Sequence, residues 1–352
     1  MLKNIFYPIL LFFLIGINII FAQIPNGYYD AGIGKKGAEL KTTLHLIINP
    51  HTQLEYYGLA TSFRTSDWHP DGYYWDMYSL TKRSSWTGLN REHNMPKSWF
   101  GVSSDEVNTW PIGSDLHNLY PSDATANSAK SNYALGVVGS SPTFSNGVVK
   151  VGKNTYPGYS GTVFEPADEY KGDFARDYMY MVTSYEDYST IWQSTGTSSM
   201  LNNNTYPVLN TYAINLLLEW ANIDPVSKKE IDRNNVVYQL QGNRNPFIDF
   251  PVLSEYIWGK YMDEVWNGSD LNPDTNKGLI LSYLQGEKKL FVKLNATSTA
   301  LYYLYSIDGM MIMTGNKIDA ESKIDVSFLQ KGMYILKIYT DNVRKTAKFI
   351  VQ

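Results

Sequence analysis

The chain has 352 residues, more than a typical single domain, so we expect one domain of ordinary size and a smaller one attached to it. Its composition, 43% hydrophobic and 18% charged, excludes intrinsic disorder, a collagen helix and a coiled coil. The absence of cysteine excludes disulfide scaffolds, thiolate metal sites and cysteine nucleophiles, and a formal net charge of −4 excludes a globally basic protein.

The first 23 residues have the pattern of a secretory signal peptide. Lys3 precedes an apolar run that continues through Ile20, and the small Ala22 stands before a polar residue, which indicates cleavage near Ala22. The alternative is a transmembrane anchor, which usually needs about 20 apolar residues. We therefore expect residues 1–23 to be removed, the processed chain to have no stable membrane span, and the mature protein to act outside the cytoplasm.

The larger part of the chain is predicted to be mainly helical. Apolar stripes and capping signals predict helices over residues 37–48, 174–185, 208–220 and 225–241. Asn49-Pro50 ends the first helix, and Asp224-Pro225 is an N-cap and first-turn pair that begins the fourth. The stripes are assigned to the core, so the polar, loop-rich residues 52–165 are the expected location of function.

A cluster of Gly, Asn, Asp and Pro at residues 266–278 predicts a linker, after which the pattern changes. Alternating runs predict a small antiparallel β domain over residues 279–352, with strands at 290–294, 300–307, 310–313, 323–329, 333–339 and 345–351. Residues 277–352 carry 11 Lys and Arg and 6 Asp and Glu, a net charge of +5, which leaves −9 for residues 1–276. Any polyanion bound by the larger part must therefore be held by local clusters of cations.

The histidines, at positions 45, 51, 69, 93 and 117, can be considered individually as candidates for acid–base chemistry. His45 and His51 are six residues apart, which matches no metal-ligand spacing, and both are interpreted as structural. His69 precedes a Pro-Asp-Gly turn and is interpreted as a surface residue.

His93 differs from the others because a carboxylate, Glu92, is adjacent to it and two cations, Arg91 and Lys97, are near. On an extended segment neighbouring side chains point to opposite faces, so Glu92 and His93 would not bind one metal ion together and would have different roles. The carboxylate can hold a hard divalent cation while a neutral imidazole takes a proton from water. The triplet by itself also fits a surface ion cluster.

A second polar segment begins 22 residues after His93, at Asp115. Pro121-Ser122-Asp123 is a helix-start signal, which places Asn127, Lys130 and Ser131 on one helical face. An amide oxygen beside an ammonium group supplies a cation ligand and a phosphate-neutralising charge, as a phosphodiester site requires.

The segments NREHNMPKSWFG (90–101) and DLHNLYPSDATANSAKSNYALG (115–136) together resemble the endonuclease I family of secreted and periplasmic nucleases. Further similar segments lie at residues 75–79, 164–169, 172–176, 230–235 and 241–247. The resemblance implies an α+β fold, in which a mainly helical nuclease domain over residues 24–265 carries a ββα-metal finger of the His-Me type and is followed by a small all-β sandwich. It also implies His93 as general base, with Glu92 and Asn127 as ligands of Mg²⁺ or another divalent cation such as Mn²⁺ or Ca²⁺.

The implied reaction is hydrolysis of phosphodiester bonds in DNA with little sequence preference, leaving 5′-phosphate ends, by a protein that we expect to be a monomer. RNA as an additional or chief substrate is an alternative. Because His93 must be neutral to act, activity should fall below its pKa, about 6.5 if unshifted.

Cations near the implied site are candidates for contacts with the substrate. Arg91, Lys97 and Lys130 would concentrate positive potential there, although Lys130 stands where many family members have arginine. Three more arginines in family-like segments would extend this surface or would pair with Asp173, Asp232 or another carboxylate; they are Arg176, Arg233 and Arg244.

The last 75 residues or so resemble the C-terminal sorting domain of the type IX secretion pathway, which implies the secretion machinery as a partner and a final location outside the cell or on its surface. An accessory β-sandwich that binds glycans is the alternative for this part. For the whole chain, the alternative from another class is a cell-surface adhesin, since 28 Tyr and 9 Trp would suit glycan stacking.

Overall fold

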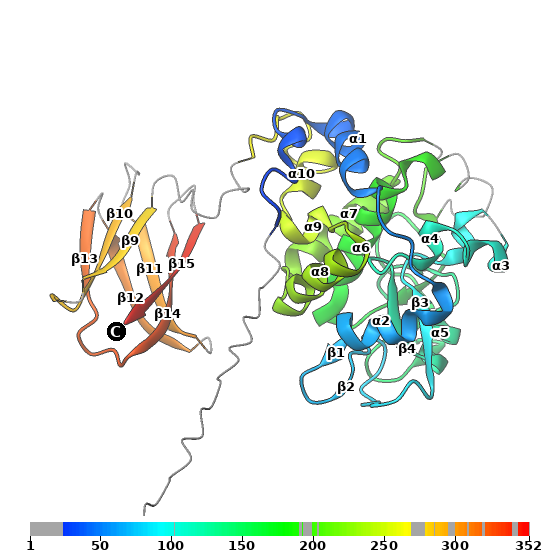
Figure 1. The fold of residues 1–352 in the computed structure, drawn as a ribbon, viewed down its shortest axis with the longest axis horizontal. Coiled ribbons are helices and arrows are strands. Elements are labelled where there is room, and N and C mark those ends of the chain that lie inside the picture. Colours follow the sequence, from blue (N-terminus) through cyan, green and yellow to red (C-terminus); the bar gives the residue numbers. More distant parts are fainter. Residues whose placement is uncertain are drawn as a thin grey trace, which may run out of the picture. The chain divides into compact units, whose positions relative to one another are not determined.

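The structure is a computed structural model, and the chain divides into two compact units, Met1–Gly268 and Ser269–Gln352 (Figure 1). The residues described are 24–101, 103–189, 192, 199–202, 204–268, 279–284, 286–294, 300–307, 310–318, 321–339 and 344–351. The predicted signal peptide and residues 269–278 of the predicted linker lie outside these ranges. Within the described part of the chain, no helix combines the length and the apolar character needed to cross a membrane.

The first unit is organised around a buried helix, α6 (Lys171–Ser184). It packs against α1 (Gly37–Ile48), α7 (Thr211–Ile223) and α9 (Pro246–Asp249). Helix α8 (Lys228–Gln241) packs against α9 and against α2 (Leu59–Ser66) (Figure 1). Because every residue of α6 is buried, the aromatic and ionic side chains on this helix all contact protein.

The helices predicted from apolar spacing are present, with differences at their ends. The first has the predicted bounds. Helix α6 begins three residues before its predicted start, and α7 begins three residues after its predicted start. The fourth begins at Lys228 because Ser227 and Glu230 form a capping box. Asp224, which we expected to cap this helix, instead accepts a hydrogen bond from the backbone nitrogen of Gly172 (2.8 Å).

Short helices and small sheets make up the rest of the first unit. The helices are α3 (Ser104–Val107), α4 (Pro111–Ser114), α5 (Ala124–Lys130) and α10 (Leu253–Ile257). A four-stranded sheet has the order β5 (Ala134–Leu135), β8 (Thr162–Glu165), β7 (Lys150–Lys153), β6 (Phe144–Ser145), and a two-stranded one contains β1 (Trp68–His69) and β2 (Tyr73–Tyr74).

A second two-stranded sheet leads directly into helix α5. Strand β3 (Leu89–His93) pairs antiparallel with β4 (Leu119–Asp123), so that Glu92 lies opposite Tyr120. The predicted helix-start signal is the end of this strand, and the helix begins at Ala124. Asp123 caps it by accepting hydrogen bonds from the backbone nitrogens of Thr125 and Ala126, both 2.9 Å long. The two polar segments of the sequence therefore lie side by side.

The second unit consists of two antiparallel sheets that share one apolar core. One sheet has the order β13 (Glu321–Asp325), β10 (Lys289–Leu294), β9 (Leu279–Leu284), and the other β12 (Met311–Ile318), β11 (Ala300–Ser306), β14 (Gly332–Tyr339), β15 (Arg344–Val351). Strand β9 was not predicted, since its sequence LILSYL does not alternate cleanly between apolar and polar residues. Together the two units give the α+β class expected from the sequence.

Candidate active site

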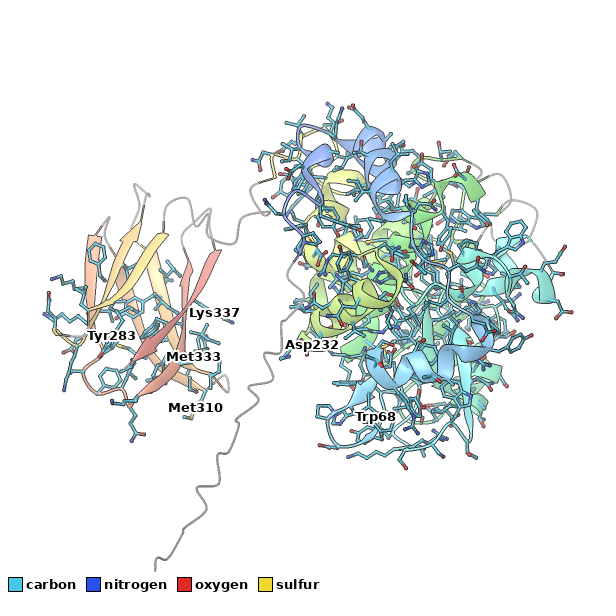
Figure 2. All side chains as sticks on the ribbon, viewed as in Figure 1. Trp68, Asp232, Tyr283, Met310, Met333 and Lys337 are labelled. Atoms are coloured by element: carbon cyan, nitrogen blue, oxygen red, sulfur yellow. The ribbon has the colours of Figure 1, made fainter. Side chains whose placement is uncertain are left out.

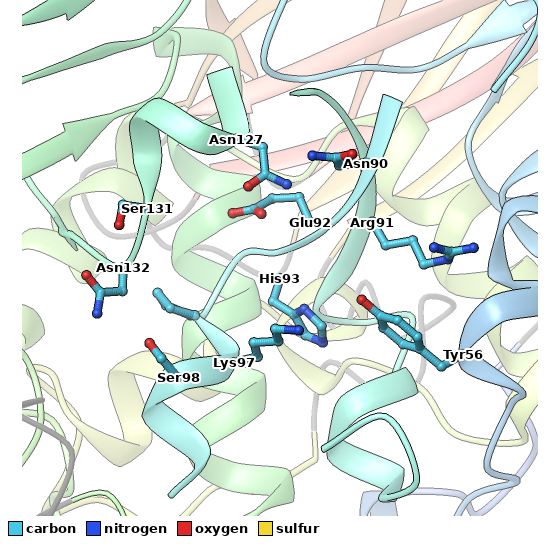
Figure 3. Close-up of a pocket in the computed structure, with 11 residues that line it drawn as sticks. Tyr56, Asn90, Arg91, Glu92, His93, Lys97, Ser98, Asn127, Ser131 and Asn132 are labelled. Carbon is cyan, nitrogen blue, oxygen red and sulfur yellow. The ribbon is translucent and has the colours of Figure 1, made fainter. Parts of the chain in front are cut away.

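A cleft of about 490 Å³ opens beside β3 and α5 (Figure 3), and we call it the His93 cleft. It is lined by Tyr56, Asn90, Arg91, Glu92, His93, Pro96, Lys97, Ser98, Asn127, Ser131 and Asn132. The structure thus brings together five residues selected from the sequence, namely Arg91, Glu92, His93, Lys97 and Asn127. Tyr56 and Ser98 were not selected, and Tyr56 comes from a segment far from the motif.

The imidazole of His93 is held in one orientation. Its Nε2 lies 3.0 Å from the carbonyl oxygen of Gly113, and because a carbonyl only accepts, Nε2 carries the proton and Nδ1 keeps its lone pair. Tyr56 stacks nearly parallel to the ring at 6.1 Å, and Phe100 approaches it edge-on at 6.0 Å. Burial lowers the pKa of His93 to about 3, so the imidazole is neutral at pH 7 and stays neutral well below the value expected from the sequence.

Gly113, which holds this imidazole, occupies a position that only glycine fits. A Cβ atom there would lie 1.7 Å from the carbonyl oxygen of Val107. The backbone of Gly113 therefore packs directly against the Val107 carbonyl, and this contact fixes where α4 and the Gly113 carbonyl lie. Sequence analysis missed this residue, because no local pattern connects it to a histidine 20 positions earlier.

Glu92 is buried and forms an ion pair with Lys130. The Nζ of Lys130 donates to Oε1 of Glu92 (2.6 Å) and to the backbone carbonyl oxygen of His93 (3.1 Å). Burial raises the pKa of the Glu92 carboxyl, against the opposing effect of Lys130. The predicted contact between Lys130 and substrate phosphate is not supported, since this side chain is 0% exposed and does not line the cleft.

Asn127 also lines the cleft, and its side-chain amide points toward the carboxylate of Glu92 (Figure 3). Among the described residues, no group of three or more His, Cys, Asp or Glu side chains could hold a metal ion. One carboxylate and one amide oxygen nevertheless fit Mg²⁺, which usually keeps several waters and is bound through one or two carboxylates together with substrate phosphates. The residues present therefore suit a hard divalent cation whose remaining ligands are water or phosphate.

The loop after His93 is fixed by two buried asparagines. The backbone nitrogen of Asn94 donates to the carbonyl oxygen of Asn118 (2.9 Å). The side chain of Asn118 accepts from the nitrogen of Met95 (2.7 Å) and donates to its carbonyl oxygen (3.1 Å). These bonds set the path of the chain between His93 and Lys97, although the sequence assigned neither asparagine a role.

Three arginines that were predicted to extend the substrate surface do not line the His93 cleft, so that prediction is not supported. They are Arg176, Arg233 and Arg244. Arg176 pairs with Glu230 (2.5 Å), Arg233 with Asp67 (2.7 Å) and Arg244 with Asp249 (2.6 Å). All three guanidinium groups are buried, with 1%, 4% and 1% of the residue exposed. Each arginine therefore pairs with a carboxylate, which is the alternative that the sequence left open. The partners are carboxylates other than Asp173 and Asp232, the two that were named.

The remaining histidines are outside the cleft. His117 is buried, its Nε2 lies 3.3 Å from the carbonyl oxygen of Asn243, and burial lowers its pKa to about 4. The Nδ1 of His45 is 2.9 Å from the carbonyl oxygen of Ser184, which agrees with a structural role. His69 is partly exposed and stacks on Tyr73 at 4.2 Å.

Comparisons with known proteins agree with this arrangement. The family model for endonuclease I matches residues 36–252, which is more than half of the chain and contains the whole His93 cleft. The chain belongs to the endonuclease I family. A second family model, for the secretion system C-terminal sorting domain, matches residues 287–352 of this endonuclease I protein.

Three curated relatives are similar to this chain. The extracellular ribonucleases of Bacillus subtilis and Bacillus amyloliquefaciens are each 34% identical over 242 residues, which cover 66% of this chain and 78% of theirs. Endonuclease-1 of Buchnera aphidicola is 27% identical over 138 residues, covering 39% of this chain and 45% of its own. The family and the sorting domain identify a secreted or cell-surface nuclease.

Proposed function

We propose that this endonuclease I protein cleaves nucleic acid by metal-assisted hydrolysis in the His93 cleft, with DNA as substrate, little sequence preference and 5′-phosphate products. The observation that carries the proposal is the meeting of three groups in one open polar cleft: the neutral imidazole of His93, the carboxylate of Glu92 and the amide of Asn127. Together these groups supply a base for water and oxygen ligands for a cation.

In this mechanism His93 accepts a proton from the attacking water at Nδ1, because Nε2 donates to Gly113. Glu92 and Asn127 would hold a divalent cation through side-chain oxygens. Lys130, which does not line the cleft, orients the Glu92 carboxylate through their ion pair. A bound divalent cation such as Mg²⁺, Mn²⁺ or Ca²⁺ supplies positive charge where negative charge develops on the phosphate and the leaving oxygen. One positioned base contributes about 10² to 10⁴-fold, so electrostatic stabilisation must contribute much of the remaining rate enhancement.

Two cations of the cleft are available for substrate phosphates despite the net charge of −9 over residues 1–276. Lys97 lines the cleft and, among the described residues, forms no salt bridge. The Nη2 of Arg91 donates to the carbonyl oxygen of Tyr57 (2.8 Å), which leaves the guanidinium charge without a carboxylate partner in the described chain. Contacts to backbone phosphates carry no sequence information, so we expect little base preference and strong salt dependence.

RNA is a second candidate substrate, because two similar proteins are named extracellular ribonucleases. The same cleft chemistry would serve either nucleic acid, since the cation ligands and the base act on the phosphodiester and on water. A parallel digestion of DNA and RNA decides between them.

The test incubates purified protein with plasmid DNA and with RNA in Mg²⁺, with and without EDTA. We expect EDTA to abolish cleavage and His93→Ala to lower the rate by about 10² to 10⁴-fold without loss of folding. His69→Ala, which removes an imidazole outside the cleft, is the matched control and should cleave normally. Cleavage that persists in EDTA would contradict metal dependence, and the absence of cleavage under every condition would favour the adhesin alternative.

A further inference from the structure

The first unit contains six arginines, and their guanidinium groups fall into two sets. Four of them pair with carboxylates: Arg83 with Asp123, Arg176 with Glu230, Arg233 with Asp67 and Arg244 with Asp249. The other two, Arg64 and Arg91, form no salt bridge with any residue that the structure describes. In a unit of net negative charge, these two guanidinium charges remain unneutralised.

Arg64, on α2, lies against aromatic rings and is exposed. Its guanidinium carbon is 5.2 Å from the ring centroid of Trp68 and 5.9 Å from that of Tyr74, and its Nε donates to the Tyr74 hydroxyl (3.1 Å). Figure 2 labels Trp68 beside this helix. Within the part of the chain that the structure describes, the guanidinium forms one further hydrogen bond, from Nη2 to the carbonyl oxygen of Ser84 (3.5 Å).

Arg91 is placed in the same way at the His93 cleft. Its guanidinium carbon lies 5.3 Å from the ring centroid of Tyr56, 5.8 Å from that of Tyr57 and 5.7 Å from that of Trp86. Trp86 in turn contacts Tyr74 with ring centroids 5.5 Å apart. A continuous series of contacts therefore joins Arg91, Trp86, Tyr74, Trp68 and Arg64, and we call these residues the arginine–aromatic track.

An aromatic platform orients a guanidinium without neutralising it, because the ring faces the flat side of the group. Those N–H groups of Arg64 that do not donate to Tyr74 or Ser84, among them the Nη1 group, can then donate to an anion such as a phosphate. Arg91 lines the His93 cleft, whereas Arg64 does not. An anion held by Arg64 would therefore lie outside the cleft, further along the track.

We propose that Arg64 binds a second backbone phosphate of the nucleic-acid strand whose scissile phosphate lies in the His93 cleft. The strand would run from the His93 cleft past Arg91 to Arg64, over the partly exposed rings of Trp86 and Trp68. Tyr74, which is 2% exposed, supports these rings from the interior. This inference rests on the proposed function and adds the direction in which the substrate extends.

The test measures binding by the full chain carrying His93→Ala, so that the substrate stays intact. Labelled DNA and RNA strands of about 16 nucleotides are titrated at several salt concentrations, and a strand of about two nucleotides is tested alongside. We expect Arg64→Gln to weaken binding of the longer strand by about fivefold and to reduce the slope of log Kd against log salt by about one. Arg64→Glu should weaken it further, and the short strand should bind equally to all variants.

Lys153→Gln is the matched control, because it removes a positive charge from an exposed position of β7 outside the track and should leave affinity and slope unchanged. The melting temperature of each variant is measured as well. An altered melting temperature with unchanged affinity and slope would mean that Arg64 only stabilises α2, which overturns the second phosphate site alone. A parent protein that neither cleaves nor binds nucleic acid would overturn the proposed function and this inference together.

Discussion

Charged side chains have different partners in the interior of the first unit and along its His93 cleft. In the interior, cations pair with carboxylates at short distances, as Arg233 does with Asp67 (2.7 Å) and Lys229 with Asp173 (2.5 Å). Along the cleft, Lys97 and Arg91 have no carboxylate partner in the described chain. A buried charge must be paired to be tolerated, whereas an open cleft can leave charge for a ligand. The difference separates residues that stabilise the fold from those available to substrate.

The largest expected effect comes from breaking an interior pair. Arg233→Met leaves Asp67, which is 3% exposed, buried without its cation, so the free energy of unfolding should fall by about 3–5 kcal/mol. Urea unfolding measures the loss, and Arg233→Met combined with Asp67→Asn should recover part of it. The exposed Arg64→Met should cost less than about 0.5 kcal/mol. Equal losses from the two arginines would contradict the comparison.

A smaller effect is expected from Gly113→Ala, which acts on the cleft from the interior. The new Cβ would clash with the Val107 carbonyl and displace the oxygen that orients His93. We expect kcat to fall by about 10²-fold with KM nearly unchanged, because the base is misplaced while the cations stay. The matched control is Gly286→Ala in the second unit, where an added Cβ meets nothing within 4 Å. A rise in KM alone would show that the carbonyl does not act through His93.

Acid should weaken the interior through His117. Its pKa is about 4 in the folded protein, because burial disfavours the charged form, and about 6.5 when unfolded. Between these values the unfolded chain binds more protons, so this contribution to stability is present above pH 6.5 and is lost as pH falls toward 4. The expected loss between pH 7 and pH 5 is about 2 kcal/mol. Urea unfolding at both values should show a shallower dependence for His117→Gln, and an unchanged dependence would contradict the assignment.

The smallest effect on catalysis is expected from removing the second unit. It forms its own apolar core and contains no histidine. A chain that ends at Gly268 should therefore cleave nucleic acid at the full rate per molecule but should remain in the periplasm, because the sorting domain is missing. Cell fractionation and a cleavage assay measure the two results. Normal secretion of the shortened chain would argue against the sorting role.

Local sequence predicted those features whose determinants are close together in the chain. The first helix was predicted with its observed bounds because its apolar spacing is regular. Glu92, His93 and Asn127, which line one cleft, were selected through two short motifs that resemble a family. The start of α8 was missed because Ser227 and Glu230 cap the helix in place of the Asp-Pro pair. Gly113 was not found, since its role depends on its carbonyl in α4 meeting the side chain of His93 at the end of β3.

The sequence by itself determined the family resemblance, the two-part organisation and the residue types of the site, because apolar periodicity and motif spacing are properties of neighbouring residues. Only the tertiary structure decided which cations are neutralised. Arg233 meets Asp67 across 166 positions and Lys130 meets Glu92 across 38, whereas Arg64 and Arg91 lie on aromatic rings. The charge of an arginine is the same in each case, and its partner is set by contacts between segments that no local pattern records.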